Sequence, residues 1–389
     1  MARKIKILEC IRQGQIGGGE SHLLSLVENL DRTRFEPVVL SFTEGPMIDR
    51  LHLLGVETYV IHTEKPFDFR VWSEVKALLK KLQIEMIHAH GTRAASNILW
   101  AARSLNIPVV YTIHGWSFHP DQHPLIRAIR IRSEKYLTSR SAINISVSAS
   151  NQQSGKQYIR DFDSIVINNG IDRNKFAPGK VSKNIRESLG IPGDRILVLF
   201  LARFTNHKQP LTLIKAFREA VAAVPALYLL MVGDGDQKKE AVEWVEHTGM
   251  QDNIGFQPFR QDVPDVLAAA DIFVLPSLWE GLPIGLLEAM AMGKAIIATE
   301  VDGTREIVQH ERNGLLIQPG DVSALTAALI RMANDEALRT TFQQRTIETV
   351  RERFDAEEMT RRIEQVYEEL PGRAKGSIVQ NKIKIAPTV

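Results

Sequence analysis

Short apolar segments alternate with longer amphipathic segments along most of this 389-residue chain. In the first half, apolar runs predict strands at residues 5–10, 37–42, 57–61, 86–89, 109–113, 142–147 and 165–167. Amphipathic stretches at 20–30, 46–54, 71–82, 93–105, 125–138 and 149–158 predict the helices between them. Apolar strands separated by helices are typical of a parallel sheet covered on both faces, which indicates the α/β class.

The same alternation begins again after residues 168–184, where Asn-Asn-Gly, Ala-Pro-Gly and several lysines form a linker composition. Strands are predicted at 195–202, 227–232, 254–256, 272–275, 295–299 and 315–317, and helices at 209–223, 236–248, 261–269, 284–292 and 321–336. Residues 335–370 have a helical pattern that ends at Pro371-Gly372. We therefore predict two doubly wound domains, at 1–173 and 185–354, joined by a linker at 174–184 and followed by a tail at 373–389.

The composition excludes several classes of protein. The only cysteine, Cys10, rules out a disulfide framework and a thiolate metal cluster, so a reducing, cytoplasmic setting is expected. The first residues lead straight into a strand pattern without a signal peptide, and no apolar run reaches the ~18–20 residues of a membrane span. The net charge is only +2, and nucleic acid is not an expected partner.

Two carboxylates lie in the segment that follows the predicted strand at 272–275. Glu280 is in a loop broken by glycine and proline, and Glu288 is about one turn inside the next helix. Ligands of open α/β sheets bind at the carboxyl ends of the strands, which is where this loop is expected. The two glutamates could form the acid/base pair of a hydrolase, accept hydrogen bonds from sugar or ribose hydroxyls, or be surface residues.

Two cations and a glycine turn follow strands in the second half. Arg203 and Lys208 come after the strand at 195–202, where a guanidinium fork and an ammonium suit a diphosphate. Gly233, in Gly-Asp-Gly after the strand at 227–232, allows close approach of backbone to a ligand. A solvated loop without a ligand explains the two cations equally well, and a lone Gly-x-Gly does not by itself indicate a ligand.

The first half has a glycine-rich turn and three histidines at strand ends. Gly18 and Gly19 open the first helix, but the spacing is neither the dinucleotide fingerprint nor a Walker loop. His88 and His90 share one face of a strand, and His114 ends the next strand. A polar cleft is favoured over a zinc site, because the sequence shows no third ligand at metal spacing.

Taken together, these motifs resemble the retaining glycosyltransferases of family 4. The resemblance rests on matches in the family's order over residues 17–316, although Ala202 stands where the family usually has glycine. The matching segments are Gly17-Gly18-Gly19-Glu20, residues 166–172 at the linker, Arg203 with Lys208, the segment from Pro276 to Gly293, residues 303–306 and Asn313-Gly314. Membership implies the GT-B architecture, in which two Rossmann-like doubly wound domains face each other across a cleft.

The resemblance also implies roles for the matched residues. Arg203 and Lys208 would hold the donor diphosphate in place of a metal ion, and no metal ligands are expected. Glu280 would bind the donor sugar and Glu288 the ribose. Backbone amides of Ile284, Gly285 and Leu286 would reach the phosphates or sugar, Gly18 and Gly19 would approach the donor phosphate, and His114 would lie beside the donor sugar. A terminal helix at about 355–370 would pack back on the N-terminal, acceptor-side domain.

The implied function is metal-independent, retaining transfer of a hexose to a glycan or lipid-linked acceptor, in bacterial cell-surface or exopolysaccharide synthesis. The expected donor is UDP-glucose or a related UDP-hexose, used as substrate, and no cofactor is expected. A catalytically silent, sugar-nucleotide-binding protein on the same fold is the alternative. Residues 125–132 mix apolar and basic side chains, which predicts either peripheral contact with an anionic membrane at its inner face or a core-packed helix with solvated arginines.

Overall fold

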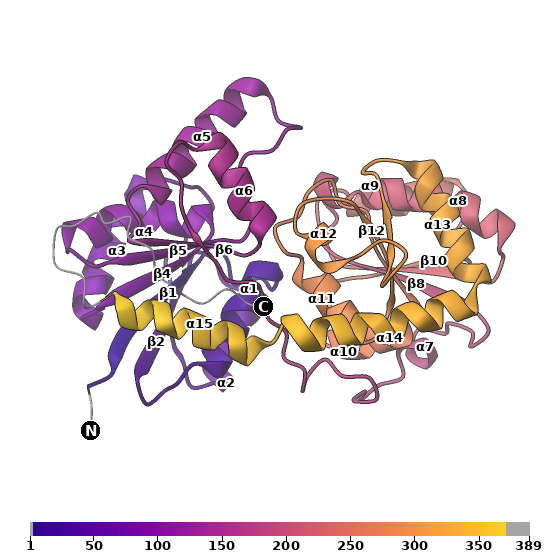
Figure 1. Cartoon of the computed structure of the whole chain (residues 1–389), viewed down its shortest axis with the longest axis horizontal. Coiled ribbons are helices and arrows are strands. Elements are labelled where there is room, and N and C mark those ends of the chain that lie inside the picture. The colour runs from indigo at the N-terminus through magenta and orange to yellow at the C-terminus, as the bar shows by residue number, and fades with distance from the viewer. Residues whose placement is uncertain (1–2, 371–389) are drawn as a thin grey trace. The chain divides into compact units, whose positions relative to one another are not determined.

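The computed structural model describes residues 3–370 and divides the chain into two compact units. The first unit consists of the described residues of Met1–Gly170 and Ala356–Val389, and the second of Ile171–Asp355 (Figure 1). Residues 174–184, assigned to a linker by their composition, belong to the second unit, where the backbone amide and hydroxyl of Ser182 both donate to Asp265 at 2.7 Å. The predicted tail at 373–389 lies outside the described residues.

The first unit contains one parallel sheet with the strand order β3-β2-β1-β4-β5-β6-β7. Its strands are β1 (Ile5–Ile11), β2 (Phe35–Ser41), β3 (Glu57–Val60), β4 (Met86–His90), β5 (Val109–Ile113), β6 (Ile143–Ser146) and β7 (Ile165–Val166). Its helices are α1 (Gly18–Asn29), α2 (Pro46–Leu53), α3 (Phe69–Leu82), α4 (Thr92–Ser104), α5 (Pro124–Thr138), α6 (Ala149–Tyr158) and α15 (Ala356–Glu369).

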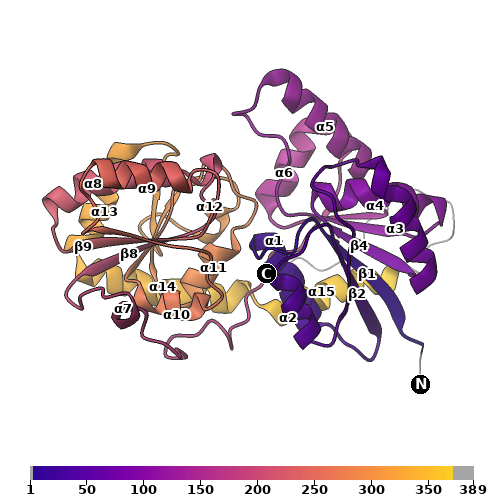
Figure 2. The ribbon, with the colours of Figure 1, turned by 180° about the vertical axis from the view of Figure 1, so that it is seen from behind.

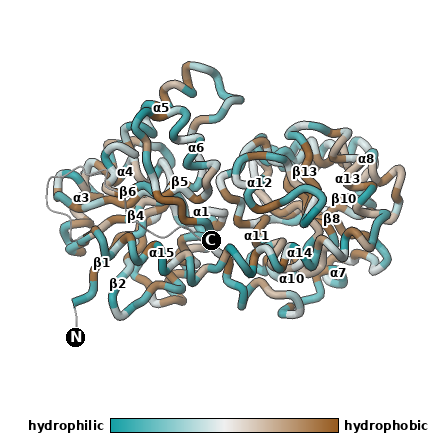
Figure 3. Tube along the Cα trace, in the orientation of Figure 1, coloured by the Kyte–Doolittle hydropathy of each residue, from teal (hydrophilic) through white to brown (hydrophobic). Residues whose placement is uncertain are grey.

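Apolar side chains on both faces of this sheet are buried by helices. One core joins β1, β4 and β5 to α3 and α4, and two smaller cores pack the opposite face against α1, α2 and α15. Seen along the Cα trace, hydrophobic stretches lie in the strands and hydrophilic ones mainly on the surrounding helices (Figure 3). This two-sided burial explains why the strands read as continuous apolar runs rather than alternating ones.

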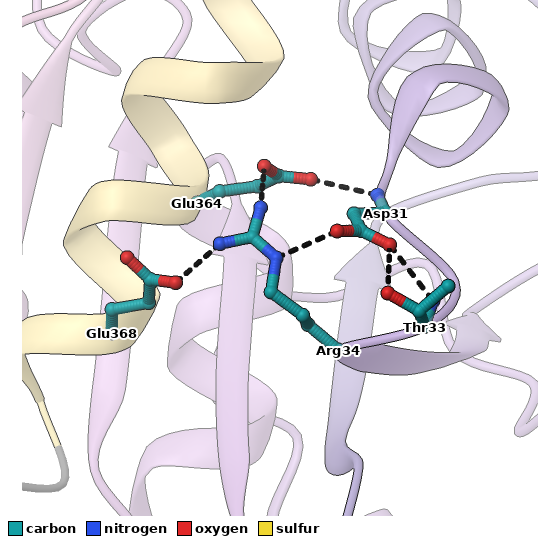
Figure 4. A network of polar contacts seen from close by, with 5 residues as sticks. All are labelled: Asp31, Thr33, Arg34, Glu364 and Glu368. Atoms are coloured by element: carbon teal, nitrogen blue, oxygen red, sulfur yellow. Dashed lines mark hydrogen bonds and ion pairs between the residues drawn. The ribbon is translucent and has the colours of Figure 1, made fainter. Parts of the chain in front are cut away.

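The last described helix, α15, is fastened to the first unit by a polar network (Figure 4). Arg34 donates to Asp31 at 2.7 Å and to Glu364 at 2.5 Å, and it also pairs with Glu368. The backbone amide of Asp31 donates to the other oxygen of Glu364 at 2.7 Å, and Thr33 donates to Asp31. Charged groups that are partly exposed contribute little singly, but this network combines with the buried apolar face of α15.

The second unit has the parallel strand order β10-β9-β8-β11-β12-β13. Its strands are β8 (Ile196–Leu201), β9 (Leu227–Val232), β10 (Ile254–Gln257), β11 (Ile272–Leu275), β12 (Ala295–Thr299) and β13 (Leu315–Ile317). Its helices are α7 (Ile185–Ser188), the short 3₁₀ helix η1 (Asn206–Lys208), α8 (Pro210–Ala223), α9 (Lys238–His247), α10 (Val263–Ala269), α11 (Ile284–Ala291), α12 (Thr304–Ile307), α13 (Val322–Asn334) and α14 (Glu336–Arg353). The helices of this unit surround its sheet in the view from behind (Figure 2).

The prediction of two doubly wound α/β domains is confirmed. Most element boundaries agree with the sequence pattern to within two residues, because local apolar runs and glycine or proline stops determine them. Residues 335–370 are helical, as predicted, in two helices: α14 ends at Arg353, and α15 begins at Ala356, close to the start of the expected terminal helix at about 355–370. Between them Phe354 is buried and Asp355 bridges to Ile171.

Candidate functional site

The strand orders place the predicted site residues at equivalent positions in the two units. In each sheet the order reverses once, between β1 and β4 in the first unit and between β8 and β11 in the second. Doubly wound proteins bind ligands at the carboxyl ends of the strands beside this reversal. The turn with Gly18 follows β1, His90 ends β4, Lys208 follows β8 and Glu280 follows β11. Topology therefore brings the sequence motifs of each half to its binding edge.

In the second unit, Lys208 and Glu280 form an ion pair across this edge. The side chains are 18% and 9% exposed, so the pair is largely shielded from solvent. Ser277 donates from its hydroxyl to the same carboxylate at 2.6 Å, and Thr299 in turn donates to the Ser277 carbonyl at 2.5 Å. Ser277 thus orients the Glu280 carboxylate, and Thr299 holds the Ser277 backbone, as a preorganised binding site requires.

Two ring side chains hold the Lys208 and Glu280 loops together. His207 and Trp279 stack with their ring centroids 4.2 Å apart and their planes 11° apart, and the Leu278 amide donates to the His207 carbonyl at 2.8 Å. His207 immediately precedes Lys208 and Trp279 immediately precedes Glu280. The stack therefore fixes the distance between the two charged groups.

The Glu280 loop also depends on a close approach of two backbone segments. A Cβ atom on Gly303 would lie 1.8 Å from the Gly281 carbonyl oxygen, so only glycine fits at position 303. Asp302, just before it, accepts from the Glu280 amide at 3.3 Å, and burial raises the pKa of the Asp302 carboxyl. This contact gives a physical role to the glycine of the Gly303–Glu306 motif.

Glu288 lies in α11, just beyond the helix start. It is partly exposed, yet burial raises its pKa from 4.5 to about 7, an effect that the charge of Lys175 reduces. A carboxyl group whose pKa is raised to about 7 by its surroundings is typical of a binding or catalytic position rather than of a solvated surface. The interpretation of Glu288 as an ordinary surface residue is therefore disfavoured.

The first amides of α11 differ in availability. The Leu286 amide donates to the Pro283 carbonyl at 3.2 Å, so it already has a partner. Ile284 and Gly285 occupy the first two positions, whose amides have no intrahelical acceptor. The structure thus leaves two of the three predicted amides, those of Ile284 and Gly285, best suited to an anionic or hydroxyl ligand.

Arg203 and Gly233 lie at the ends of adjacent strands, β8 and β9. Arg203 is exposed in the loop that leads to Lys208. Gly233 has a φ of +140°, and a Cβ there would lie 2.1 Å from the Ala202 carbonyl oxygen. Gly233 is therefore required by packing against the β8 end, and close approach of a ligand is not needed to explain it.

In the first unit, the glycine turn opens directly into α1. Gly14 is required sterically, because its Cβ would lie 2.6 Å from the backbone of Glu44 and Gly45. Gly18 has open space around it, and a Cβ on Gly19 would lie 3.5 Å from the His114 ring, an ordinary contact. Nothing in the packing demands glycine at positions 18 and 19, which is consistent with a turn kept open for a ligand.

A buried polar network lies beneath this turn. Parallel pairing places Glu9 of β1 opposite His88 of β4, and Glu9 accepts from His90 at 2.9 Å and from the Tyr367 hydroxyl at 2.7 Å. Because the Tyr367 proton goes to Glu9, His88 Nδ1 donates to the Tyr367 oxygen at 2.6 Å. His88 Nε2 then accepts from Thr112 at 2.7 Å. His88 is thus a structural residue with both nitrogens in use.

His22 and His114 extend the network toward the turn. His114 Nε2 lies 3.1 Å from His90 Nδ1, and His22 Nδ1 lies 2.9 Å from the Asn169 Oδ1. The His22 and His114 rings contact edge-to-face at 4.8 Å between centroids. Burial and the neighbouring rings lower the pKa of His22 to about 3 and that of His114 well below its usual value, so both are neutral at pH 7.

Two models of protein families match the chain in succession. The one described as Glycosyltransferase Family 4 matches residues 16–175, and the one described as Glycosyl transferases group 1 matches residues 181–349. The chain belongs to glycosyltransferase family 4. The resemblance drawn from the motifs is therefore confirmed, and the two doubly wound domains are those of the GT-B fold.

Curated relatives of this glycosyltransferase cover most of its length. An Escherichia coli UDP-Gal:alpha-D-GlcNAc-diphosphoundecaprenol alpha-1,3-galactosyltransferase is 26% identical over 86% of this chain and 89% of its own. A phosphatidyl-myo-inositol mannosyltransferase of Mycolicibacterium smegmatis is 27% identical over 92% and 91%. Among solved structures, Anabaena HepE in complex with UDP-glucose has a TM-score of 0.83 and 25% identity, covering 94% of this chain and all of its own.

Sequence reasoning missed several residues that this glycosyltransferase uses to build its two edges. Glu9, His22, Asn169 and Tyr367 complete the histidine network, and the partners of the Lys208–Glu280 pair were not anticipated. A glutamate inside the apolar segment Ile-Leu-Glu-Cys was the one available signal, because a charged residue in a buried strand requires partners.

Within the described residues, no helix is long and apolar enough to cross a membrane.

Proposed function

We propose that this protein is a metal-independent, retaining glycosyltransferase that moves a hexose from a UDP-hexose, UDP-glucose or a related sugar, to a glycan or lipid-linked acceptor in cell-surface polysaccharide synthesis. The observation that carries the proposal is the shielded Lys208–Glu280 pair at the reversal point of the second sheet. Lys208 supplies a cation for a diphosphate, and Glu280 supplies an acceptor for sugar hydroxyls. No metal or cofactor takes part in the proposed reaction.

Lys208 and Arg203 would act on the leaving group. Cleavage of the sugar–phosphate bond leaves additional negative charge on UDP, and cations aimed at that charge stabilise the transition state more than the ground state. In the structure Lys208 is paired with Glu280. A bound diphosphate competes for the ammonium group and thereby frees the Glu280 carboxylate to accept sugar hydroxyls. Donor binding and sugar orientation are coupled in this scheme.

The start of α11 would position the rest of the donor. Glu288 would accept from the ribose hydroxyls, a role that its carboxylate fulfils best when ionised. The amides of Ile284 and Gly285, at the positive end of the helix dipole, would donate to the phosphates or sugar. Orientation by fixed hydrogen bonds is a large part of what such a site contributes to rate.

In the first unit, His114 would lie beside the donor sugar, and Gly18 and Gly19 beside the donor phosphate. The neutral imidazole of His114 can donate or accept a hydrogen bond but carries no charge to compete with Lys208. Retention would follow from attack on the same face that the leaving group departs from, with a phosphate oxygen taking the acceptor proton. The relatives support the donor class, since HepE was solved with UDP-glucose and the Escherichia coli relative is named for UDP-Gal.

Contact with an anionic membrane is part of the proposal, and α5 is the element that supports it. Leu125, Ile126 and Ile129 are 64%, 48% and 54% exposed. Arg132, on the same helix, is also exposed. An apolar face flanked by cations suits the surface of an anionic bilayer, where a lipid-linked acceptor would be found. Flotation with liposomes containing anionic lipid should recover the wild type and not Ile126→Asp, and recovery of both would contradict this part.

Donor turnover tests the proposed function directly. Lys208→Ala and Glu280→Ala should each lower the rate of UDP release from UDP-hexose by at least about 100-fold, the usual cost of removing one preorganised charge-stabilising group. Lys239→Ala, which removes an 87%-exposed lysine from the same unit, is the matched control and should keep the wild-type rate. Wild-type rates in both site variants would refute the proposal. If the protein binds UDP-hexose but transfers no sugar to any tested acceptor or to water, the alternative of a catalytically silent, sugar-nucleotide-binding protein is favoured.

A further inference from the structure

Three histidine nitrogens converge in the first unit, at the carboxyl ends of β4 and β5 and the start of α1. Ligand atoms of His22, His90 and His114 all lie within 4.8 Å of one another. His22 and His90 are 1% and 2% exposed, whereas His114 is partly exposed. The group is therefore enclosed on the protein side and accessible at His114.

The hydrogen bonds behind these histidines leave one nitrogen of each ring close to the other two. A carboxylate can only accept, so His90 donates from Nε2 to Glu9 and keeps on Nδ1 a lone pair that can accept from His114 Nε2, 3.1 Å away. His22 donates from Nδ1 to Asn169, and its buried Nε2 has no hydrogen-bond partner among the described residues. A buried, unpartnered nitrogen costs stability and calls for an explanation.

The neighbouring group Glu9–His88–His90 shows what a purely structural arrangement looks like. Its ligand atoms are also close together, but His88 donates to Tyr367 and accepts from Thr112, and Glu9 receives two donors. Every polar atom there has a partner within the protein. Only the group with His22 combines convergent nitrogens with an unused one among the described residues.

We propose that His22, His90 and His114 bind a divalent transition-metal ion, with Zn²⁺ as the preferred ion, through Nε2, Nδ1 and Nε2. Tetrahedral Zn²⁺ with Zn–N bonds of about 2.0–2.1 Å places its ligand nitrogens about 3.3–3.4 Å apart. His90 Nδ1 and His114 Nε2 are already 3.1 Å apart, and side-chain shifts of at most about 1.5 Å bring His22 into range. His114 then carries its proton on Nδ1, and water completes the coordination on the accessible side.

The groups behind the ligands match those of established metal sites. Metal-binding histidines usually donate their second N–H to a carboxylate or carbonyl, which fixes the ring and raises its basicity. Glu9 does this for His90 and Asn169 does it for His22. Three imidazoles without a thiolate favour Zn²⁺, Cu²⁺ or Ni²⁺ over Mg²⁺ or Ca²⁺.

The bound ion regulates the protein rather than assisting the reaction, an inference that rests on the proposed function. Transfer itself needs no metal in that proposal, and His114 is the residue placed beside the donor sugar. An ion on His114 Nε2 removes this nitrogen from hydrogen bonding and adds positive charge at the edge next to Gly19. Zn²⁺ therefore inhibits turnover, reversibly, when it occupies this site.

Cobalt spectroscopy tests the site without any measurement of activity. Co²⁺ added to the full-length wild-type chain should give the intense visible bands of tetrahedral nitrogen and oxygen coordination at one ion per chain, and Zn²⁺ should displace it. His22→Ala should weaken Zn²⁺ binding at least 100-fold by calorimetry. Asn169→Ala, which removes the acceptor behind His22 Nδ1, should weaken it about 10–100-fold. His62→Ala, at an exposed histidine of the same unit, should leave binding unchanged.

Two results would overturn the site: no tetrahedral Co²⁺ spectrum in the wild type, or unchanged affinity in a folded His22→Ala variant. If His22→Ala does not fold, the wild-type spectrum and the Asn169→Ala affinity decide the question.

Equimolar Zn²⁺ should lower UDP release at least tenfold in the wild type, and a chelator should restore it. Binding at the site without any loss of turnover would refute the inhibitory role, whereas a chain with no turnover under any condition would refute the proposed function and leave the binding result standing.

Discussion

The carboxyl of Glu288 is expected to make the stability of the second unit depend on pH. Burial raises its pKa from 4.5 in an unfolded chain to about 7 in the folded one. An acid with a raised folded-state pKa binds more protons when folded, so folding stability falls as pH rises from about 4.5 to 7 and is constant above. Glu288→Gln removes this titration while keeping the side-chain shape.

The size of the effect follows from the difference in pKa. A difference of about 2.5 corresponds to about 3 kcal/mol, and partial exposure of Glu288 reduces this to about 2–3 kcal/mol. Glu288→Gln should therefore exceed the wild type by less than about 1 kcal/mol near pH 5 and by about 2–3 kcal/mol at pH 8. For a unit of this size that is a rise in Tm of roughly 5–10 °C.

Thermal and guanidinium unfolding of both proteins between pH 5 and 8 measures this difference. Glu348→Gln, at an exposed position of α14, is the matched control and should show no pH-dependent gain. A constant difference between Glu288→Gln and the wild type across this range would show that the Glu288 pKa is not raised.

Binding of the donor should show the opposite preference. If only the ionised carboxylate holds the ribose, the ionised fraction at a pKa of about 7 predicts an affinity for UDP-glucose about tenfold higher at pH 8 than at pH 6. The phosphates of UDP-glucose do not titrate in this range. Glu288→Gln should abolish the pH dependence and weaken binding, so a residue that costs stability would be retained for its function. Equal pH dependence in both proteins would assign the titration to another group.

Three further predictions concern packing, the buried network and metal independence. Gly303→Ala should destabilise the second unit by at least about 2–3 kcal/mol, because its Cβ would lie 1.8 Å from the Gly281 oxygen, whereas Gly285→Ala, with its nearest contact at 3.8 Å, should change Tm little. Tyr367→Phe should cost about 1–3 kcal/mol in guanidinium unfolding, because one oxygen of Glu9 loses its donor and His88 Nδ1 loses its acceptor, and an unchanged midpoint would contradict the network. Chelators should not lower the rate of UDP release. Activity abolished by a chelator would contradict the proposal that Arg203 and Lys208 hold the donor diphosphate in place of a metal ion.

Properties that depend on neighbouring residues could be predicted from the sequence. Strands and helices were located because apolar runs, amphipathic periods and glycine or proline stops are local features. The edge positions of Arg203, Lys208 and Glu280 followed as well, because each comes directly after a predicted strand. The break at Phe354 did not follow from the helical pattern, since a buried aromatic between two helical segments does not interrupt the helical period, and the separate terminal helix at about 355–370 was expected only from the family resemblance.

Contacts between distant residues were decided by the tertiary structure. Tyr367 meets Glu9 across 358 positions and His22 meets Asn169 across 147, and neither pairing has a local signal. They depend on the strand order and on α15 returning to the first unit, which helix and strand periods do not specify. The motifs of the sequence therefore determined which edges of the sheets carry chemistry, and only the packing of the chain decided that His22 would lie beside His90 and His114.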